Sequence, residues 1–347
     1  MTPSTFFYTI LFSILFYPNT VLVEANYLDS LKMESTEDDE TLFSYLNKQE
    51  EVTIHVSESL RSILKDFKND TITNGSIEFV TGDKTYSYSS KIECGGKTRR
   101  KICRTPPLKL NFKKKALKKD KFNKSCDKMK IVFQCENSGK MANSILSEML
   151  IYDLYRIVSP FGFRAFKAKV KIGTDKKHLQ TLVLEDEDDL MYRTATAVLK
   201  NRTIGTNVME RNYYVRMCLF QYMIGNTDWS ARKGHNTKLF RRLEDNALII
   251  IPYDFDYSGI INNDYAVPSE KIRIENVRTR HFMDKTIGRD ELDPAIADFI
   301  KWESDIFGSV TNAEYLSNST RNSMSNYIKD FYKIIKDEKK IKRMLKK

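Results

Sequence analysis

Two apolar segments, each followed by a group of polar residues, most constrain the fold that this chain can adopt. The first is an apolar helical run that stops at Gly225, a residue suited to a helix C-terminus, and the loop after it carries Asp228 and Asn236. The second is the β-branched run of residues 247–251, which has the length of a strand and is followed by Asp-Phe-Asp at residues 254–256. Each apolar segment must be buried, so we expect the polar groups at the edge of the core.

The two aspartates after the second segment predict a cation site. In an extended segment residues i and i+2 point the same way, so Asp254 and Asp256 are expected to share one face. Two such carboxylates repel each other unless a cation lies between them. Mg²⁺ that accompanies a nucleotide takes one or two carboxylates together with phosphate oxygens. The pattern therefore favours a divalent cation and a phosphorylated ligand.

The order of these groups parallels that of a protein kinase, in which a catalytic Asp and a metal-binding Asn precede an Asp-Phe-Gly metal ligand. With Asn-Thr-Asp at residues 226–228 and Asp-Phe-Asp at 254–256, roughly residues 50–285 resemble the atypical, secreted protein kinases of the CotH spore-coat type, and more loosely the HipA-like kinases. The resemblance implies that Asp228 is catalytic, and accepts or orients the proton of an acceptor hydroxyl. It also implies that Asn236, Asp254 and Asp256 hold Mg²⁺ or Mn²⁺.

One spacing departs from the kinase pattern. Seven residues separate Asp228 from Asn236, whereas the protein-kinase loop has four at this place. The insertion must bulge for both side chains to reach one metal ion, or Asn236 is not a ligand.

The resemblance also implies a strand lysine that binds the ATP phosphates and a helix glutamate that orients it. The glutamate is Glu148, on a helix expected over residues 142–158. The lysine is either Lys130 or Lys109, because both lie on expected strands. The alternative for each lysine is a solvent-facing strand residue.

Two further stretches are candidates for nucleotide contacts. Gly95 and Gly96 begin a loop with several cations, and glycines let backbone N–H groups approach a phosphate. An ordinary turn has the same composition, and only the glycine and the flanking basic residues match the family's loop. Glu185 opens the acidic run that, by the resemblance, joins two lobes, and it is a candidate ribose contact.

These patterns predict an α+β chain with a two-lobed protein-kinase-like fold. The N-lobe, residues 51–185, is expected to be an antiparallel sheet plus one helix, and the C-lobe, residues 186–347, to be mainly helical. Expected strands are 52–56, 77–80, 85–92, 108–112, 128–135, 163–172, 179–184 and 247–251, and expected helices are 57–67, 142–158, 207–224, 291–307 and 322–345.

The N-terminus predicts export. Residues 1–25 have the apolar core and the small final residue of a secretory signal peptide, with an uncleaved anchor as the alternative. Residues 26–50 form a polar, acidic leader. No later segment is long and apolar enough to cross a membrane, so we expect a secreted or extracytoplasmic protein, in a periplasm, at a cell surface or in a secretory lumen.

The five cysteines support the same compartment. Four of them lie in one block and could form two disulfide bonds in an oxidising environment, with a connectivity that spacing does not reveal. Zinc binding is disfavoured because no Cys-x2-Cys pair occurs. Cys218 lies in an apolar helix and is expected to be a buried free thiol. The block consists of Cys94, Cys103, Cys126 and Cys135.

The formal net charge of +11 is concentrated in residues 113–121 and in the last fifteen residues. Attraction to an anionic surface is one interpretation, and a solvated lysine-rich face is the other. No nucleic-acid partner is expected, because the basic runs lack interleaved aromatic residues and no known binding motif occurs.

The sequence therefore predicts an atypical kinase that transfers the γ-phosphoryl group of ATP to a hydroxyl, on an exported protein, with Mg²⁺ or Mn²⁺. The alternative is a catalytically inactive, kinase-like scaffold or binding protein of the secretory or extracellular compartment, which the weak glycine loop and the long Asp–Asn spacing favour. Metal-dependent hydrolysis at the carboxylates is a third hypothesis, and it requires a site that admits water and holds no nucleotide.

Overall fold

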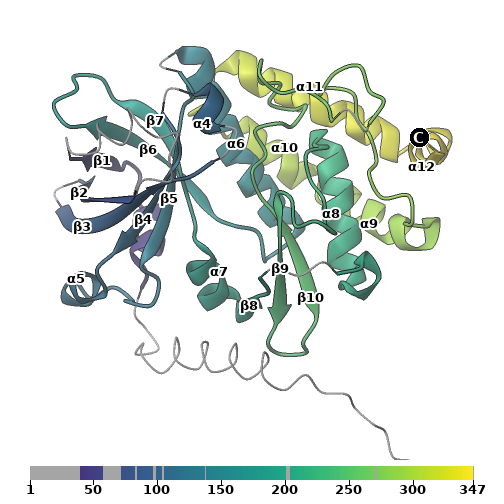
Figure 1. Ribbon diagram of the computed structural model, residues 1–347. Coiled ribbons are helices and arrows are strands. Elements are labelled where there is room, and N and C mark those ends of the chain that lie inside the picture. The colour runs from purple at the N-terminus through teal and green to yellow at the C-terminus, as the bar shows by residue number, and fades with distance from the viewer. Residues whose placement is uncertain are drawn as a thin grey trace, which may run out of the picture.

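A seven-stranded barrel forms the first part of the fold in the computed structural model (Figure 1). The structure describes residues 40–57, 72–82, 84–96, 99–103, 105–136, 138–200, 204–269 and 272–346. Around the barrel the strands follow the order β1, β2, β3, β4, β5, β7, β6. Their bounds are β1 Thr53–Val56, β2 Ile72–Thr81, β3 Lys84–Cys94, β4 Leu108–Phe112, β5 Lys128–Phe133, β6 Ala165–Ile172 and β7 Leu179–Leu184.

One parallel pair closes the barrel. β1 pairs antiparallel with β2, where Thr53 lies opposite Val80, and parallel with β6, where Thr53 lies opposite Lys169. The predicted two-lobed protein-kinase-like fold with an open antiparallel sheet is therefore wrong, because the main sheet is a closed, mixed barrel. Alternating apolar residues reveal that a segment is a strand, but they do not reveal which distant strand it pairs with.

The inside of the barrel is filled by the apolar side chains that alternate along its strands. The buried residues include Ile92 on β3, Leu110 on β4 and Ile131 on β5. Along each strand, the residues that alternate with the inward-facing ones point away from the inside of the barrel. The helix α2 (Leu42–Asn47) lies within the stretch expected to be a polar leader, and its apolar residues join this same core. The expected signal peptide, residues 1–25, lies outside the described residues, and so does the expected helix over 57–67 except for its first residue.

A long helix connects the barrel with the rest of the molecule. α6 (Gly139–Val158) packs against β7 on one side and against α8 (Arg211–Ile224) and α10 on the other (Figure 1). α8 ends as expected, with Gly225 in the left-handed conformation at φ +65°. It begins at Arg211, later than the expected residue 207, and its N-cap is Glu210, whose carboxylate accepts from the Tyr213 N–H.

A second, smaller sheet and further helices complete the chain. β10, β9 and β8 form a three-stranded sheet in that order. The first basic cluster includes α5, whose lysines are exposed. The bounds are α4 Arg99–Ile102, α5 Lys114–Lys119, α7 Glu187–Thr194, β8 Thr196–Val198, the short 3-10 helix Thr206–Val208, β9 Thr237–Arg242, β10 Leu248–Pro252, α9 Arg289–Lys301, α10 Glu303–Thr311, α11 Asn318–Ile335 and α12 Glu338–Lys346.

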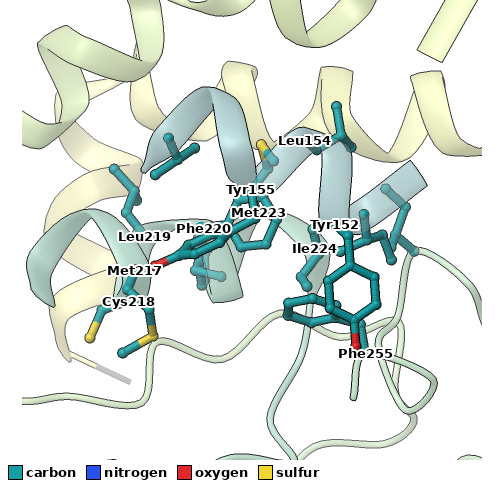
Figure 2. Close-up of a cluster of buried hydrophobic side chains, with 14 of the residues drawn as sticks. Tyr152, Leu154, Tyr155, Met217, Cys218, Leu219, Phe220, Met223, Ile224 and Phe255 are labelled. Atoms are coloured by element: carbon teal, nitrogen blue, oxygen red, sulfur yellow. The ribbon is translucent and has the colours of Figure 1, made fainter. Parts of the chain in front are cut away.

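Aromatic rings between α6 and α8 fix the Asp-Phe-Asp segment. Figure 2 shows side chains of both helices packed around Phe255. The Tyr152 ring lies 4.9 Å from the Phe255 ring, and the Phe220 ring lies 6.1 Å from it. Phe255 is fully buried, so the main chain on both sides of it is held against the helical core.

One disulfide bond is present in the described part of the chain. It joins Cys103 and Cys135, whereas two bonds were expected in this block. Cys94 and Cys126 are buried free thiols, and so is Cys218, as predicted. Among the described residues, no helix has the length and apolar character that a membrane crossing requires.

Candidate functional site

A cleft of about 1090 Å³ lies between the outer face of the barrel and the loops beside β9 and β10. Most of the residues singled out from the sequence line it, although they come from distant parts of the chain. Glu148 and Gly95 are the two exceptions among them. The predicted site residues on the cleft wall are Gly96, Lys109, Lys130, Glu185, Asp228, Asn236, Asp254 and Asp256.

The barrel side of the cleft is a wall of lysines. Lys109 on β4 lies directly opposite Lys130 on β5, and Lys128 follows on the same face. Like charges directly opposite each other destabilise a sheet. Lys109 is 3.8 Å from Glu93, whereas Lys130 makes no ion pair with any residue that the structure describes. This wall is therefore suited to an anion, and Lys130 is a cation of the wall without an ion pair among the described residues.

The opposite side of the cleft is built by the loop after α8. Its long insertion folds into a tight hairpin, in which the N–H of Ser230 donates to the carbonyl of His235 at 2.9 Å and the N–H of His235 donates back at 3.1 Å. Gly234, at φ +61°, makes the turn. The hairpin returns Asn236 to Asp228, so the insertion does bulge, as the spacing required.

Two neighbours orient the Asp228 carboxylate. His235 Nε2 lies 2.8 Å from Oδ1, and the amide of Asn236 donates to Oδ2 at 3.0 Å. The sequence analysis did not assign a role to His235. On a helix, residues seven apart lie two turns from each other, and in a strand they point to opposite faces, so neither pattern would pair His235 with Asp228. The hairpin brings them together. Asp228 is thus a partly exposed, oriented acceptor.

Asp254 does not continue the strand before it. β10 ends at Pro252, and Asp254 adopts φ +62° while its N–H donates to the Tyr152 hydroxyl at 3.0 Å. Asp254 and Asp256 therefore do not share a strand face, contrary to the expectation. Asn236 has φ +50° as well, and residues other than glycine rarely adopt this conformation outside functional sites and turns.

Asp256 is held by a buried arginine. Arg99 Nε donates to Asp256 Oδ2 at 3.2 Å, and Nη2 donates to Glu148 Oε2 at 2.9 Å. The exposed fractions of Arg99, Glu148 and Asp256 are 7%, 2% and 5%. The Tyr265 hydroxyl also donates to Asp256, at 3.1 Å. Both hydrogen bonds are accepted by the same oxygen, Oδ2.

The buried cluster shifts the pKa values of its members. Burial raises the pKa of Glu148 to about 8, although Arg99 opposes the shift. Burial likewise raises the pKa of Asp256, again against Arg99. The pKa of Arg99 is lowered by burial but raised further by Asp256 and Glu148, so its guanidinium stays charged.

Arg99 replaces the predicted lysine as the partner of Glu148. No hydrogen bond or ion pair joins Glu148 to Lys130 or Lys109 among the described residues. Arg99 is one of the cations in the loop that begins at Gly95 and Gly96, so the sequence did contain this partner as a candidate. The choice of partner was wrong because strand-to-helix spacing does not show which cation turns inward.

Glu185 and Gly95, which were predicted to contact a nucleotide, bond to other residues of the protein. Glu185, 2% exposed, pairs with Arg164 at 2.7 Å and with Arg193 at 2.8 Å. The N–H of Gly95 donates to the carbonyl of Pro107 at 2.7 Å. Neither group points freely into the cleft.

Lys238 on β9 is a cleft residue that the sequence analysis missed. Burial lowers its pKa to about 8, its ammonium pairs with Glu187, and it lies 5.3 Å from the centre of the Tyr253 ring. Six apolar residues also line the cleft and give part of it an apolar surface. They are Val132, Phe163, Leu184, Met191, Ala197 and Val198.

The protein donors for a cation are few. A search of the described ranges finds no group of three or more His, Cys, Asp or Glu residues placed to hold a metal ion. Asp254, with Asn236 and Asp228 across from the lysine wall, offers oxygen donors that suit Mg²⁺ or Mn²⁺ only when ligand oxygens supply the rest. Asp256 also lines the cleft, but its Oδ2 is bound by Arg99 and Tyr265, so its role toward a cation stays a prediction.

Comparisons with known proteins give little further information. No family model matches the chain, and no curated protein matches it. Among solved structures, the chain is similar to the Helicobacter pylori proinflammatory kinase CtkA, with 10% identity over 65% of this chain and 90% of that chain and a TM-score of 0.37. A distant structural neighbour is thus a kinase, membership of the CotH family is not shown, and a likeness of this degree carries no argument about function.

Proposed function

We propose that this protein binds ATP with Mg²⁺ or Mn²⁺ in the cleft and transfers the γ-phosphoryl group to a hydroxyl. The observation that carries the proposal is that Lys109 and Lys130 of the barrel and Asp228 and Asp254 of the later loops line one cleft. A lysine wall suits the phosphates, and carboxylates suit a metal ion bound to them. The apolar surface that includes Leu184 and Val198 suits the adenine ring.

Each residue has a defined role in this proposal. Lys130 binds phosphate oxygens, with Lys109 beside it, and Asp254 and Asn236 hold the cation. The cation supplies neutralisation of the phosphate charge. Asp228 accepts the proton of the acceptor hydroxyl while the hydroxyl oxygen bonds to the γ-phosphorus. The bond from that phosphorus to the bridging oxygen breaks, and its electron pair leaves with ADP.

An exported protein as the acceptor and an extracytoplasmic location belong to the same proposal. The apolar start of the chain supports them, and so does the Cys103–Cys135 bond, since disulfide bonds persist mainly in oxidising compartments.

An inactive binding protein is the second candidate. It is favoured by the engagement of Asp256 with Arg99, which leaves fewer carboxylates for metal than the sequence suggested. In that case the cleft retains a nucleotide without turnover.

Calorimetric titration of the full chain with ATP, with and without Mg²⁺ or Mn²⁺, tests the proposal. We expect metal-dependent binding that Asp254→Asn and Lys130→Met both weaken, while Lys333→Met, on the surface of α11, has no effect. Absence of binding with either metal would overturn the proposal.

Transfer of radiolabelled phosphate from ATP, to the chain itself or to an added protein, separates catalyst from binder. Asp228→Asn should retain ATP binding and lose transfer. Binding without any transfer by the unaltered chain would favour the inactive binding protein.

A further inference from the structure

The Cys103–Cys135 disulfide adjoins the buried cluster that holds Asp256. Cys103 directly follows α4, and its N–H donates to the carbonyl of Arg99 at 2.8 Å. Cys135 lies just past Phe133, whose carbonyl accepts from Arg99 Nη1 at 3.3 Å. The disulfide therefore ties the helix that carries Arg99 to the strand end that Arg99 contacts.

α4 depends on such attachments. It has four residues, and a single turn of helix is not stable by itself because nucleation is unfavourable. Its described attachments are the hydrogen bond from the Arg100 N–H to the Gly96 carbonyl at 2.9 Å, the side-chain contacts of Arg99, and the disulfide. The disulfide is the one covalent tie among them.

The second residue that holds Asp256 also touches the disulfide. Cys103, Cys135 and Met141 form a small apolar cluster of their own, and Tyr265 packs against it. Tyr265 in turn donates its hydroxyl to Asp256 at 3.1 Å. Both side chains that bind this carboxylate therefore rest on the disulfide or on the helix next to it.

We propose that the Cys103–Cys135 disulfide is a clamp that makes the Glu148–Arg99–Asp256 cluster, and with it nucleotide binding in the cleft, dependent on the oxidised state. A dithiol reductant would break the sulfur–sulfur bond: with two electrons and two protons the cysteines become thiols, and the dithiol becomes a disulfide. The effect on nucleotide binding rests on the proposed function, whereas the effect on the cluster does not.

Loss of the clamp acts through charge. Arg99 is the cation that pairs with both buried carboxylates. When α4 loosens, Glu148 and Asp256 lose the hydrogen bonds that Arg99 donates to them, in a place that water reaches poorly. The Asp-Phe-Asp segment that carries Asp254 then loses one of its attachments to the rest of the protein.

Hydrogen exchange of the full chain, before and after treatment with dithiothreitol, tests the clamp directly. Backbone amides of residues 99–102 and 254–257 should exchange at least about tenfold faster after reduction. Amides of the β2–β3 hairpin should not change. The double variant Cys103→Ser/Cys135→Ser should resemble the reduced chain and no longer respond to dithiothreitol.

ATP binding in the presence of Mg²⁺ is the second measurement. Reduction should weaken it by about tenfold or more, and reoxidation should restore it. The control Cys218→Ala lacks a buried thiol of α8 but keeps the disulfide, so it should respond to dithiothreitol as the unaltered chain does.

Arg99→Met distinguishes a clamp that acts through Arg99 from general stabilisation by a cross-link. In the oxidised chain this substitution should already give the fast exchange at residues 254–257, and reduction should add little to it. Arg99→Lys should restore part of the protection, because it keeps a cation. Circular dichroism of each variant confirms that it folds.

The outcomes separate this inference from the proposed function. Unchanged exchange at residues 99–102 and 254–257 after complete reduction would overturn the clamp, whatever ATP does. Additive effects of reduction and Arg99→Met would also contradict it. A chain that shows the exchange response but binds no ATP in any state would retain the clamp and lose the kinase proposal.

Discussion

One amide nitrogen of Asn236 donates to two oxygens of Asp228, the backbone carbonyl at 2.8 Å and the carboxylate Oδ2 at 3.0 Å. The contact spans an inserted hairpin and holds the proposed catalytic residue in one orientation. It also links the two residues that the sequence could only suggest as a pair.

Replacing Asn236 tests this contact and its backbone at the same time. Asn236→Ala removes the hydrogen bonds and places a less suitable residue at φ +50°, so it should lower the free energy of unfolding by about 1–3 kcal/mol. Asn236→Gly also removes the bonds but accepts this φ, and should cost less. Urea unfolding measures both, and equal costs would show that the backbone conformation is unimportant.

Lys109 and Lys130, which lie opposite each other, are expected to lower the stability of the sheet and to strengthen anion binding. Lys130→Ala removes a like-charge opposition and should leave stability unchanged or raise it by up to about 1 kcal/mol. It should weaken ATP binding by roughly tenfold, or about 1.4 kcal/mol. Lys109→Ala should weaken binding less, because Glu93 already compensates Lys109. Thermal unfolding and calorimetry give the two quantities, and a larger effect of Lys109→Ala would reverse the assignment.

The buried Glu148 predicts a pH dependence of stability. Burial raises its pKa in the folded chain from the ordinary value of 4.5 to about 8. Between these values the folded state binds more protons than the unfolded state, so the contribution of Glu148 is fully present below about pH 4.5 and is lost as the pH rises through about 8. The slope is at most about 1.4 kcal/mol per pH unit.

Glu148→Gln removes this titration and is the matched reference. The stability of the unaltered chain relative to Glu148→Gln should fall between about pH 5 and pH 8, as measured by urea unfolding at each pH. A relative stability that rises over this range would mean that Arg99 outweighs burial and holds Glu148 charged.

The end of α8 should tolerate no side chain larger than glycine. Gly225 has φ +65°, and an added Cβ would overlap the hydroxyl of Tyr327. Gly225→Ala should therefore destabilise the chain by about 1–3 kcal/mol. Gly308→Ala, inside α10 with open space around the site, should stabilise it by about 0.5–1 kcal/mol. Thermal unfolding compares the two, and similar shifts would contradict the role of Gly225.

Local structure could be predicted where a single residue, or a regular alternation of apolar and polar residues, determines it. The apolar run before Gly225 gave the end of α8, and the alternation over residues 108–112 gave β4 with its observed bounds. β9 was missed, because its residues around Lys238 show no regular alternation of apolar and polar residues. The barrel was not predictable, since its closure requires the parallel pairing of β1 with β6, which no local pattern encodes.

The sequence predicted which residues meet at the site better than it predicted the contacts that they make. Asp228, Asn236 and Asp254 meet on one cleft wall, as their grouping suggested, and their role toward nucleotide and metal stays a prediction. The contacts of Glu148 could not be predicted, because the cation that pairs with it is Arg99 on α4 and not a lysine of the strands.

The closed barrel also limits how another chain can associate with this one. An open sheet ends in strands with unpaired N–H and C=O groups, onto which a strand of another molecule can add. Every strand of the barrel has a neighbour on both sides. Among the described strands, β8 and β10 of the small sheet have a neighbour on one side only, and residues 84–89 of β3 pair with β2 but not with β4. Strand addition to the described part of the chain, by a peptide or a second copy, would therefore use β8, β10 or such a partly paired stretch.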